Sequence, residues 1–173
     1  MVIKMKTLYM IGGTMGAGKT AVSRCLNKLL PYCVFLDGDW CWNMDPFIVD
    51  EETKAMVTDN IIYLLNSFLR CSVYENIVFC WVMHEQDIID GILSRLDISG
   101  CRVICVSLVL SEKSLRERLE GDILAGIREP DIIERSLARL PLYQKLNTYK
   151  LDVSGIPPER AAELICEIKN KTL

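Results

Sequence analysis

Gly13-Thr14-Met15-Gly16-Ala17-Gly18-Lys19-Thr20, near the start of the chain, is its most informative stretch. It matches the pattern G-x-x-x-x-G-K-[ST], known as Walker A, which binds nucleotide phosphates. Successive backbone N–H groups can converge on phosphate oxygens only through turns that a Cβ atom would obstruct, and this accounts for the three glycines of the pattern. We therefore expect all eight residues to belong to a nucleoside triphosphate site.

The neighbouring sequence supports this interpretation over a glycine-rich turn without a ligand. Lys19 offers a positive charge to the β- and γ-phosphates, and the Thr20 hydroxyl is placed to ligate Mg²⁺. Residues 8–11 form an apolar run typical of a strand. Apolar residues after the motif recur at helical spacing, namely Val22, Cys25, Leu26, Leu29 and Leu30. A helix that begins here presents its positive end to the phosphates of ATP.

Composition restricts the class of protein. The 173 residues are enough for one domain, half of them are hydrophobic, and a quarter are charged. No apolar run is long enough to cross a membrane, and residues 1–6 are too short for a signal peptide. The net charge of −3 argues against nucleic acid as a partner. Eight cysteines without a C-x-x-C pair, beside a single histidine, indicate reduced thiols, no zinc site and a cytoplasmic protein.

Strands and helices alternate along the whole chain. Apolar runs predict strands at residues 8–11, 33–36, 76–83, 102–110 and 149–153. Residues between them carry helical periodicity, with the second helix starting near Glu51 and the last near Pro157. This pattern predicts a three-layer α/β P-loop NTPase fold with a five-stranded parallel sheet, in which ligands bind beyond the carboxyl ends of the strands.

One segment late in the chain has the features of a mobile lid, which we place at about residues 121–140. Gly121 and Gly126 are expected to weaken the end of the helix that precedes the lid. Asp131 and Glu134 have capping-box spacing, so a helix should begin there, and Pro141 should end it.

Asp37 and Asp39 follow the second predicted strand. In extended chain their side chains point the same way. One interpretation makes Asp37 a Mg²⁺ ligand and Asp39 the group that orients or deprotonates an acceptor hydroxyl. The alternative is a simple turn, since Asp-Gly is also a hairpin signal, although no strand follows it.

Two stretches carry a resemblance to known kinases. Walker A followed by Leu36-Asp37-Gly38-Asp39 resembles the gluconokinases and adenylylsulfate kinases, and the D-x-D spacing resembles shikimate kinase. Arg139-Leu140-Pro141-Leu142-Tyr143 is similar to the R-x-P-L-Y stretch of shikimate kinase, whose arginine holds the substrate carboxylate. The resemblance implies that Arg139 binds substrate, that Arg128 is a catalytic lid arginine, and that Arg118 packs on adenine. One departure is the segment 81–85, where shikimate kinase has a glycine-rich turn.

Other side chains near the predicted ligand edge are candidates for the acceptor site. Trp40, Trp42, Trp81 and His84 could form an aromatic wall beside Asp39, although tryptophans more often pack in a core. Arg135 lies four residues before Arg139, on a face without the apolar residues of that helix. The two arginines could stabilise phosphoryl charge from the lid, or they could simply form a solvated helix face.

The leading hypothesis is an ATP- and Mg²⁺-dependent small-molecule kinase that phosphorylates a hydroxyl, with Lys19, Asp39 and Arg128 as catalytic residues. A nucleoside or nucleotide kinase is the alternative, although only Lys54, Arg70 and Arg95 supply cations between residues 40 and 100. A GTP switch or ATP-driven motor ranks last, because the guanine-specifying N-K-x-D is absent from the sequence. The expected partner is a small-molecule acceptor, with neither nucleic acid nor membrane, and the protein is a monomer or homodimer.

Overall fold

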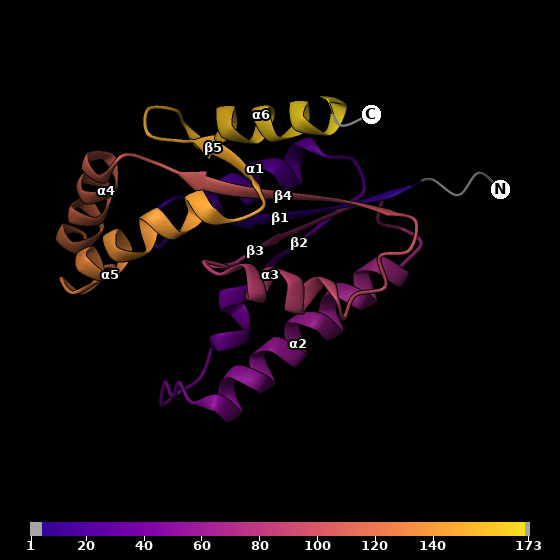
Figure 1. Cartoon of the computed structure of the whole chain (residues 1–173), viewed down its shortest axis with the longest axis horizontal. Coiled ribbons are helices and arrows are strands. Elements are labelled where there is room, and N and C mark those ends of the chain that lie inside the picture. The colour runs from indigo at the N-terminus through magenta and orange to yellow at the C-terminus, as the bar shows by residue number, and fades with distance from the viewer. Residues whose placement is uncertain (1–4, 172–173) are drawn as a thin grey trace.

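The computed structural model describes residues 5–171, with the side chains of 169–171 left out of the description. Its centre is a parallel sheet of five strands in the order β2-β3-β1-β4-β5 (Figure 1). The strands are β1 (Lys6–Gly12), β2 (Cys33–Asp37), β3 (Asn76–Cys80), β4 (Cys101–Val109) and β5 (Tyr149–Asp152). This architecture confirms the predicted α/β fold. The prediction that residues 1–6 form no signal peptide falls largely outside the described residues.

Helices cover both faces of the sheet, which gives three layers. The helices are α1 (Lys19–Leu29), α2 (Glu51–Arg70), α3 (Gln86–Leu93), α4 (Glu112–Leu124), α5 (Ile132–Arg139) and α6 (Pro158–Lys171), with 3₁₀ turns η1 (Gly38–Trp42) and η2 (Leu140–Lys145). Figure 1 shows α1 and α6 on one face and α2 and α3 on the other. The pair α4 and α5 lies beyond the carboxyl ends of the strands, at the left of the view.

Two hydrophobic clusters hold the layers together, and β1 supplies both. Tyr9 and Ile11 pack in the cluster on the α1 and α6 side, whereas Leu8 and Met10 pack in the cluster on the α2 and α3 side. Successive side chains of a strand point to opposite faces, so a strand buried on both faces must be apolar throughout. This explains the unbroken apolar run at residues 8–11.

Two details of the predicted elements were wrong, namely the end of the third strand and the burial of Leu29. The third strand ends at Cys80 rather than at Met83, because the chain turns away and Met83 adopts a positive φ of 30°. Helix α4 runs through Gly121 to Leu124 and ends just before Gly126, which has a positive φ of 69°, so of these two glycines it is Gly126 that lies at the helix end. Leu29, expected on the apolar stripe of α1, is 52% exposed in the last turn.

The predicted capping box at the start of α5 is also absent. Asp131 occupies the N-cap position without a side-chain hydrogen bond to the helix, and its carboxylate pairs with Arg135 at 3.1 Å instead. Helix α5 ends at Arg139, just before Pro141, as predicted, and the chain continues into η2 with the proline in its first turn. A proline is tolerated there because the first N–H groups of a helical turn need no partner within it.

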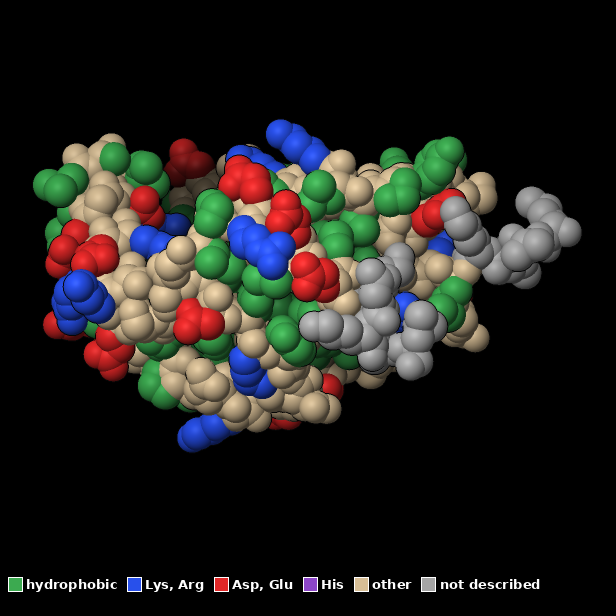
Figure 2. Space-filling model, turned by 90° about the horizontal axis from the view of Figure 1, so that it is seen from above, with side chains coloured by type: hydrophobic (Ala, Val, Ile, Leu, Met, Phe, Trp, Pro, Cys, Tyr) green, Lys and Arg blue, Asp and Glu red, His purple; other side chains and the backbone are tan. Residues whose placement is uncertain are grey.

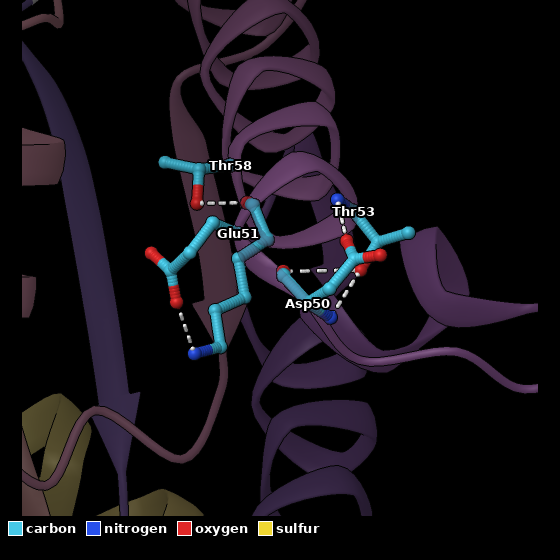
Figure 3. A network of polar contacts seen from close by, with 5 residues as sticks. Asp50, Glu51, Thr53 and Thr58 are labelled. Atoms are coloured by element: carbon cyan, nitrogen blue, oxygen red, sulfur yellow. Dashed lines mark hydrogen bonds and ion pairs between the residues drawn. The ribbon is translucent and has the colours of Figure 1, made fainter.

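Helix α2 does begin with a capping box, formed by Asp50 and Thr53 (Figure 3). The Asp50 carboxylate accepts a hydrogen bond from the Thr53 backbone N–H at 2.8 Å, and the Thr53 hydroxyl accepts one from the Asp50 N–H at 2.9 Å. Thr58 donates its hydroxyl to the Lys54 carbonyl one turn on. These contacts fix the point where the loop after η1 becomes helix.

Charges are mixed on the face of the molecule that carries α6. Figure 2 shows acidic and basic side chains interspersed with hydrophobic ones there, with no continuous basic area among the described residues of this face. No helix in the described part of the chain is both long and apolar enough to span a membrane.

Candidate active site

The Walker A stretch forms an open turn between β1 and α1. Gly16 and Gly18 have φ angles of +83° and +93°, which residues with a Cβ rarely adopt. A Cβ on Gly16 would also lie 2.7 Å from Leu119 Cδ2, so α4 packs directly on this turn. Helix α1 has no acidic side chain in its first turn, which leaves its positive end free to receive an anion.

Lys19 and Thr14 show how the loop is held. The Lys19 ammonium donates to the Thr14 carbonyl at 3.1 Å, and the Thr14 hydroxyl donates to the Ser136 carbonyl at 2.9 Å, which ties the loop to α5. Burial lowers the pKa of Lys19, while the nearby Asp39 and Asp37 carboxylates oppose that shift. An anion bound beside Lys19 would offset the cost of burying this charge.

A cleft of about 560 Å³ lies over this loop. Residues 15–22 line it, and Val153, Ile156 and Pro158 add an apolar side to the lining. Arg118 also lines the cleft and donates to the carbonyls of Ala17 and Val153. Gly13 and Thr14 do not line the cleft, so they shape the turn from behind it. The position of Arg118 is compatible with the adenine contact that the resemblance implies.

Thr20 lines the first cavity and contacts Asp37, which lines neither cavity. The Thr20 hydroxyl donates to the Asp37 carboxylate at 2.6 Å, and Asp37 is only 4% exposed. Two hard oxygen donors suit Mg²⁺, which keeps water or phosphate oxygens as its other ligands. No group of three or more His, Cys, Asp or Glu side chains in the described residues could hold a metal alone. The residues therefore fit a magnesium ion that arrives with a nucleotide.

Asp39 lies in η1 rather than in extended chain, so the predicted parallel orientation of the two carboxylates is wrong. The Asp37 carboxylate accepts the Asp39 backbone N–H at 3.1 Å and caps the 3₁₀ turn. The alternative interpretation, in which Asp37-Gly38-Asp39 is a turn, therefore describes the local backbone structure. Partial burial and the Asp37 charge raise the pKa of Asp39, against the opposing effect of Lys19 and Arg128. Such a carboxylate takes up a proton more readily than an ordinary aspartate.

A second cavity, of about 930 Å³, lies beside the first. It is lined by all the side chains that sequence analysis assigned to the acceptor, namely Asp39, Trp40, Trp42, Trp81, His84 and Arg139. They come from η1, the loop after β3 and the end of α5, which meet only in the folded chain. Arg128 and Arg135 line the same cavity.

The two cavities share four residues: Met15, Lys19, Asp39 and Arg128. Three of these are the side chains predicted to be catalytic. A group bound over the Walker A loop and a group bound in the second cavity would therefore meet at Lys19, Asp39 and Arg128.

His84 and Arg139 form a polar corner of the second cavity. Burial, together with the positive charge of Arg139, lowers the pKa of His84, so its imidazole is neutral at pH 7. Its Nδ1 atom is buried without a hydrogen-bond partner. The Arg139 guanidinium donates to the Met15 sulfur at 3.8 Å, and no described carboxylate lies within 4.0 Å of the guanidinium.

Arginines of the predicted lid are held by local ion pairs. Arg128 Nε donates to the Asp122 carboxylate at 2.9 Å, with both side chains about one-third exposed. Asp122 itself lines the first cavity, next to the Walker A loop. Arg135 pairs with Asp131. The mobility of this lid segment stays a prediction.

Sequence reasoning missed the packing of Gly38 on Trp81. A Cβ on Gly38 would lie 2.7 Å from Trp81 Cγ and Cδ1, so the indole lies directly against the glycine that separates the two aspartates. It also did not assign to the site six residues that line the second cavity, namely Asn43, Phe47, Val49, Lys54, Val82 and Ile88. The loop at 43–50 matches no motif. The feature of the sequence that could have indicated a binding site there is the group of apolar residues in a segment predicted to be a loop.

The fold and the two cavities define a P-loop protein with a kinase-like architecture. Comparison with protein families matches residues 10–134 to the family described as AAA domain. The chain belongs to this family. Comparison with curated proteins yields no matching sequence.

Solved structures of two kinases and of a resistance protein share the fold. Shikimate kinase from Acinetobacter baumannii is 21% identical, with a TM-score of 0.66 over 97% of this chain and 94% of that one. A gluconokinase from Sinorhizobium meliloti 1021 is 18% identical, with a TM-score of 0.64 over 98% and 99%. The tunicamycin resistance protein of Deinococcus radiodurans is 18% identical, with a TM-score of 0.68 over 95% of each chain. At these identities the likeness establishes the fold, and it confirms the resemblance seen in the sequence.

Proposed function

We propose that the protein is an ATP- and Mg²⁺-dependent kinase that transfers the γ-phosphoryl group of ATP to the hydroxyl of a small molecule. The observation that carries this proposal is the junction of the two cavities. Lys19, Asp39 and Arg128 line both. Phosphoryl transfer needs this arrangement, because the donor and acceptor must meet in line with charged groups around the transferred phosphoryl.

On this proposal the first cavity binds ATP. The N–H groups of the Walker A loop and the Lys19 ammonium hold the phosphates, while Arg118 and the apolar side of the cleft hold the base. Thr20 and Asp37 would hold Mg²⁺, directly or through water, and the ion when bound neutralises phosphate charge. Arg128 would leave Asp122 and turn to the transferred group, since both residues already line this cavity.

Asp39 is the residue that acts on the acceptor. Its carboxylate orients the hydroxyl and takes its proton late in the transfer. A new bond forms between the hydroxyl oxygen and the γ-phosphorus as the bond to the bridging oxygen of the β-phosphate breaks. The products are ADP and a phosphate monoester, and the proton passes through Asp39 to solvent. The raised pKa of Asp39 suits a group that must accept this proton.

Substitution Asp39→Asn tests the proposal. Asparagine keeps the size of the side chain and its place in η1 but cannot take a proton. We expect ATP·Mg²⁺ affinity within about twofold of the parent and acceptor-dependent ADP production reduced by roughly 10²–10⁴. The loss of activity of the parent at low pH should follow the raised pKa of Asp39, because protonation removes the base, and this acidic limb should disappear in the variant.

Asp97→Asn is the matched control, since this exposed aspartate lies near the opposite edge of the sheet, before β4 begins. It should turn over like the parent. If Asp39→Asn also does so with an identified acceptor alcohol, Asp39 is not the base and the mechanism is wrong.

A nucleotide kinase is the second candidate, and one observation favours it. The sequence argument against a phosphate acceptor was the scarcity of cations between residues 40 and 100. Helix α5 brings Arg135 and Arg139 into the cavity that also contains Lys54. A phosphate acceptor needs no general base, so normal turnover of a nucleoside monophosphate by Asp39→Asn would favour this candidate.

A further inference from the structure

The chemistry of the second cavity identifies a class of acceptor. Four aromatic rings line it: Trp40, Trp42 and Phe47 from η1 and the following loop, and Trp81 from the loop after β3. All three tryptophans of the sequence are among them. Trp40 and Phe47 are 52% and 66% exposed, so a large aromatic area borders the cavity instead of being buried in the core.

Neighbouring groups fix how these rings are presented. Trp42 and Phe47 meet at 5.9 Å with their planes 53° apart, so they form a corner and do not stack on each other. The Trp40 ring rests edge-on against Phe35 at 5.2 Å. Trp81 is backed by Gly38, where even a methyl group would collide with the indole. Rings supported from behind in this way are ready to pack against a flat ligand.

The polar side chains of the cavity offer many more hydrogen-bond donors than acceptors. Of the sixteen lining residues, eight are hydrophobic and five are Lys or Arg, which only donate hydrogen bonds. The remaining side chains are Asp39, Asn43 and His84. A sugar acid brings several hydroxyl donors that need acceptors, and unmatched donors are costly once desolvated. An acceptor with one reactive hydroxyl makes no such demand.

Cations that line the same cavity add a second requirement. Arg139 has no described carboxylate within 4.0 Å, while Lys54, Arg128 and Arg135 already pair with Glu51, Asp122 and Asp131. His84 beside it is neutral, so it does not compete for an anion. A partly buried guanidinium without a counterion is matched by an anionic group on the ligand.

We propose that the acceptor is a planar aromatic or heteroaromatic alcohol that bears an anionic group. Its ring packs in the corner of Trp42 and Phe47, its anionic group pairs with Arg139, and its hydroxyl reaches Asp39. The reactive hydroxyl rests on the proposed kinase function, whereas the binding of a flat anion does not.

The test compares two probes that differ only in the ring. One is para-(hydroxymethyl)benzoate and the other is its saturated counterpart, trans-para-(hydroxymethyl)cyclohexanecarboxylate. Binding to the full chain is followed by tryptophan fluorescence, excited where the benzoate does not absorb, because every tryptophan of the protein lines this cavity. We expect the benzoate to bind about three- to tenfold more tightly than the saturated acid, the range typical of an added aromatic contact.

Variants locate the effect. Phe47→Leu and Trp42→Leu keep an apolar side chain without its aromatic ring, and each should bring the ratio of the two affinities toward one; Trp42→Phe should restore most of it. Tyr63→Leu is the control, since this aromatic residue of α2 is 69% exposed and does not line the cavity. Thermal unfolding of each variant verifies that it is folded.

Turnover separates the two proposals. ADP production with para-(hydroxymethyl)benzoate supports both, and preferential binding of the benzoate without ADP production from any acceptor supports the acceptor class while contradicting the kinase function. ADP production with gluconate or shikimate, together with equal binding of the two matched probes, overturns the acceptor class and leaves the kinase function standing. Absence of binding by either probe also overturns the acceptor class.

Discussion

Gly38 is the residue whose substitution tests the packing of the acceptor cavity most directly. The substitution Gly38→Ala adds one methyl group at a position whose backbone is not left-handed, so its effect is steric. The added Cβ would lie 2.7 Å from Trp81 Cγ and Cδ1 and 3.1 Å from Trp81 Cβ. Carbon atoms pack at about 3.5–4.0 Å, so the indole must move by about 1 Å.

Overpacking of this kind costs about 1–3 kcal/mol of unfolding free energy. For a chain of this length we expect a fall in Tm of roughly 2–12 °C. The displaced indole should also alter tryptophan fluorescence. Nucleotide affinity should stay close to that of the parent, because neither Gly38 nor Trp81 lines the first cavity.

Gly91→Ala is the matched control. Gly91 lies within α3, and a Cβ there would meet nothing within 4 Å. Alanine is the better helix former, so this substitution should stabilise the protein by about 0.5–1 kcal/mol, with the opposite sign to Gly38→Ala. Differential scanning calorimetry measures both changes.

A double variant shows whether the contact with Trp81 is the cause. Trp81→Leu shortens the side chain and makes room for the new methyl group. In that background Gly38→Ala should cost at least about 0.5 kcal/mol less than it does alone. An equal cost in both backgrounds, or a Gly38→Ala protein as stable as the parent, would refute the steric argument.

Three further predictions concern the nucleotide site, the lid and pH. Lys19→Ala should weaken ATP·Mg²⁺ binding by at least about tenfold in calorimetry, whereas Lys28→Ala, an exposed lysine of α1, should not. Amide hydrogen exchange at residues 121–135 should slow when ATP·Mg²⁺ binds, as Arg128 leaves Asp122, and equal rates in both states would contradict a lid. Because the folded state lowers the pKa of His84 below its ordinary 6.5, the unfolded state takes up the proton first as pH falls. The histidine therefore costs no stability above pH 6.5 and progressively destabilises the parent below it. In urea titrations at a series of pH values, His84→Gln should lose less unfolding free energy than the parent below pH 6.5. If the unfolding free energies of the two proteins fall in parallel with pH, the shift is contradicted.

Local sequence determined the phosphate-binding loop and most of the secondary structure. The loop depends on backbone angles and glycine spacing within eight consecutive residues, so its chemistry is readable without the fold. The strands follow from apolar runs long enough to be buried on both faces, and their alternation with helices implies the parallel sheet. Predictions failed at element ends such as Asp131 and Met83, where local contacts and backbone angles decide the structure.

Tertiary structure alone decided how the acceptor cavity is assembled. Trp42, Trp81 and Arg139 lie far apart in the chain, and they meet because the β2-β3-β1-β4-β5 order places their elements around one edge of the sheet. The sequence proposed each of them as a candidate, but no local pattern encodes that they share a cavity with Asp39. The contact of Gly38 with Trp81 is of the same kind. It depends on the distance between the segments that follow the paired strands β2 and β3, which packing fixes and which residue spacing along one strand cannot express.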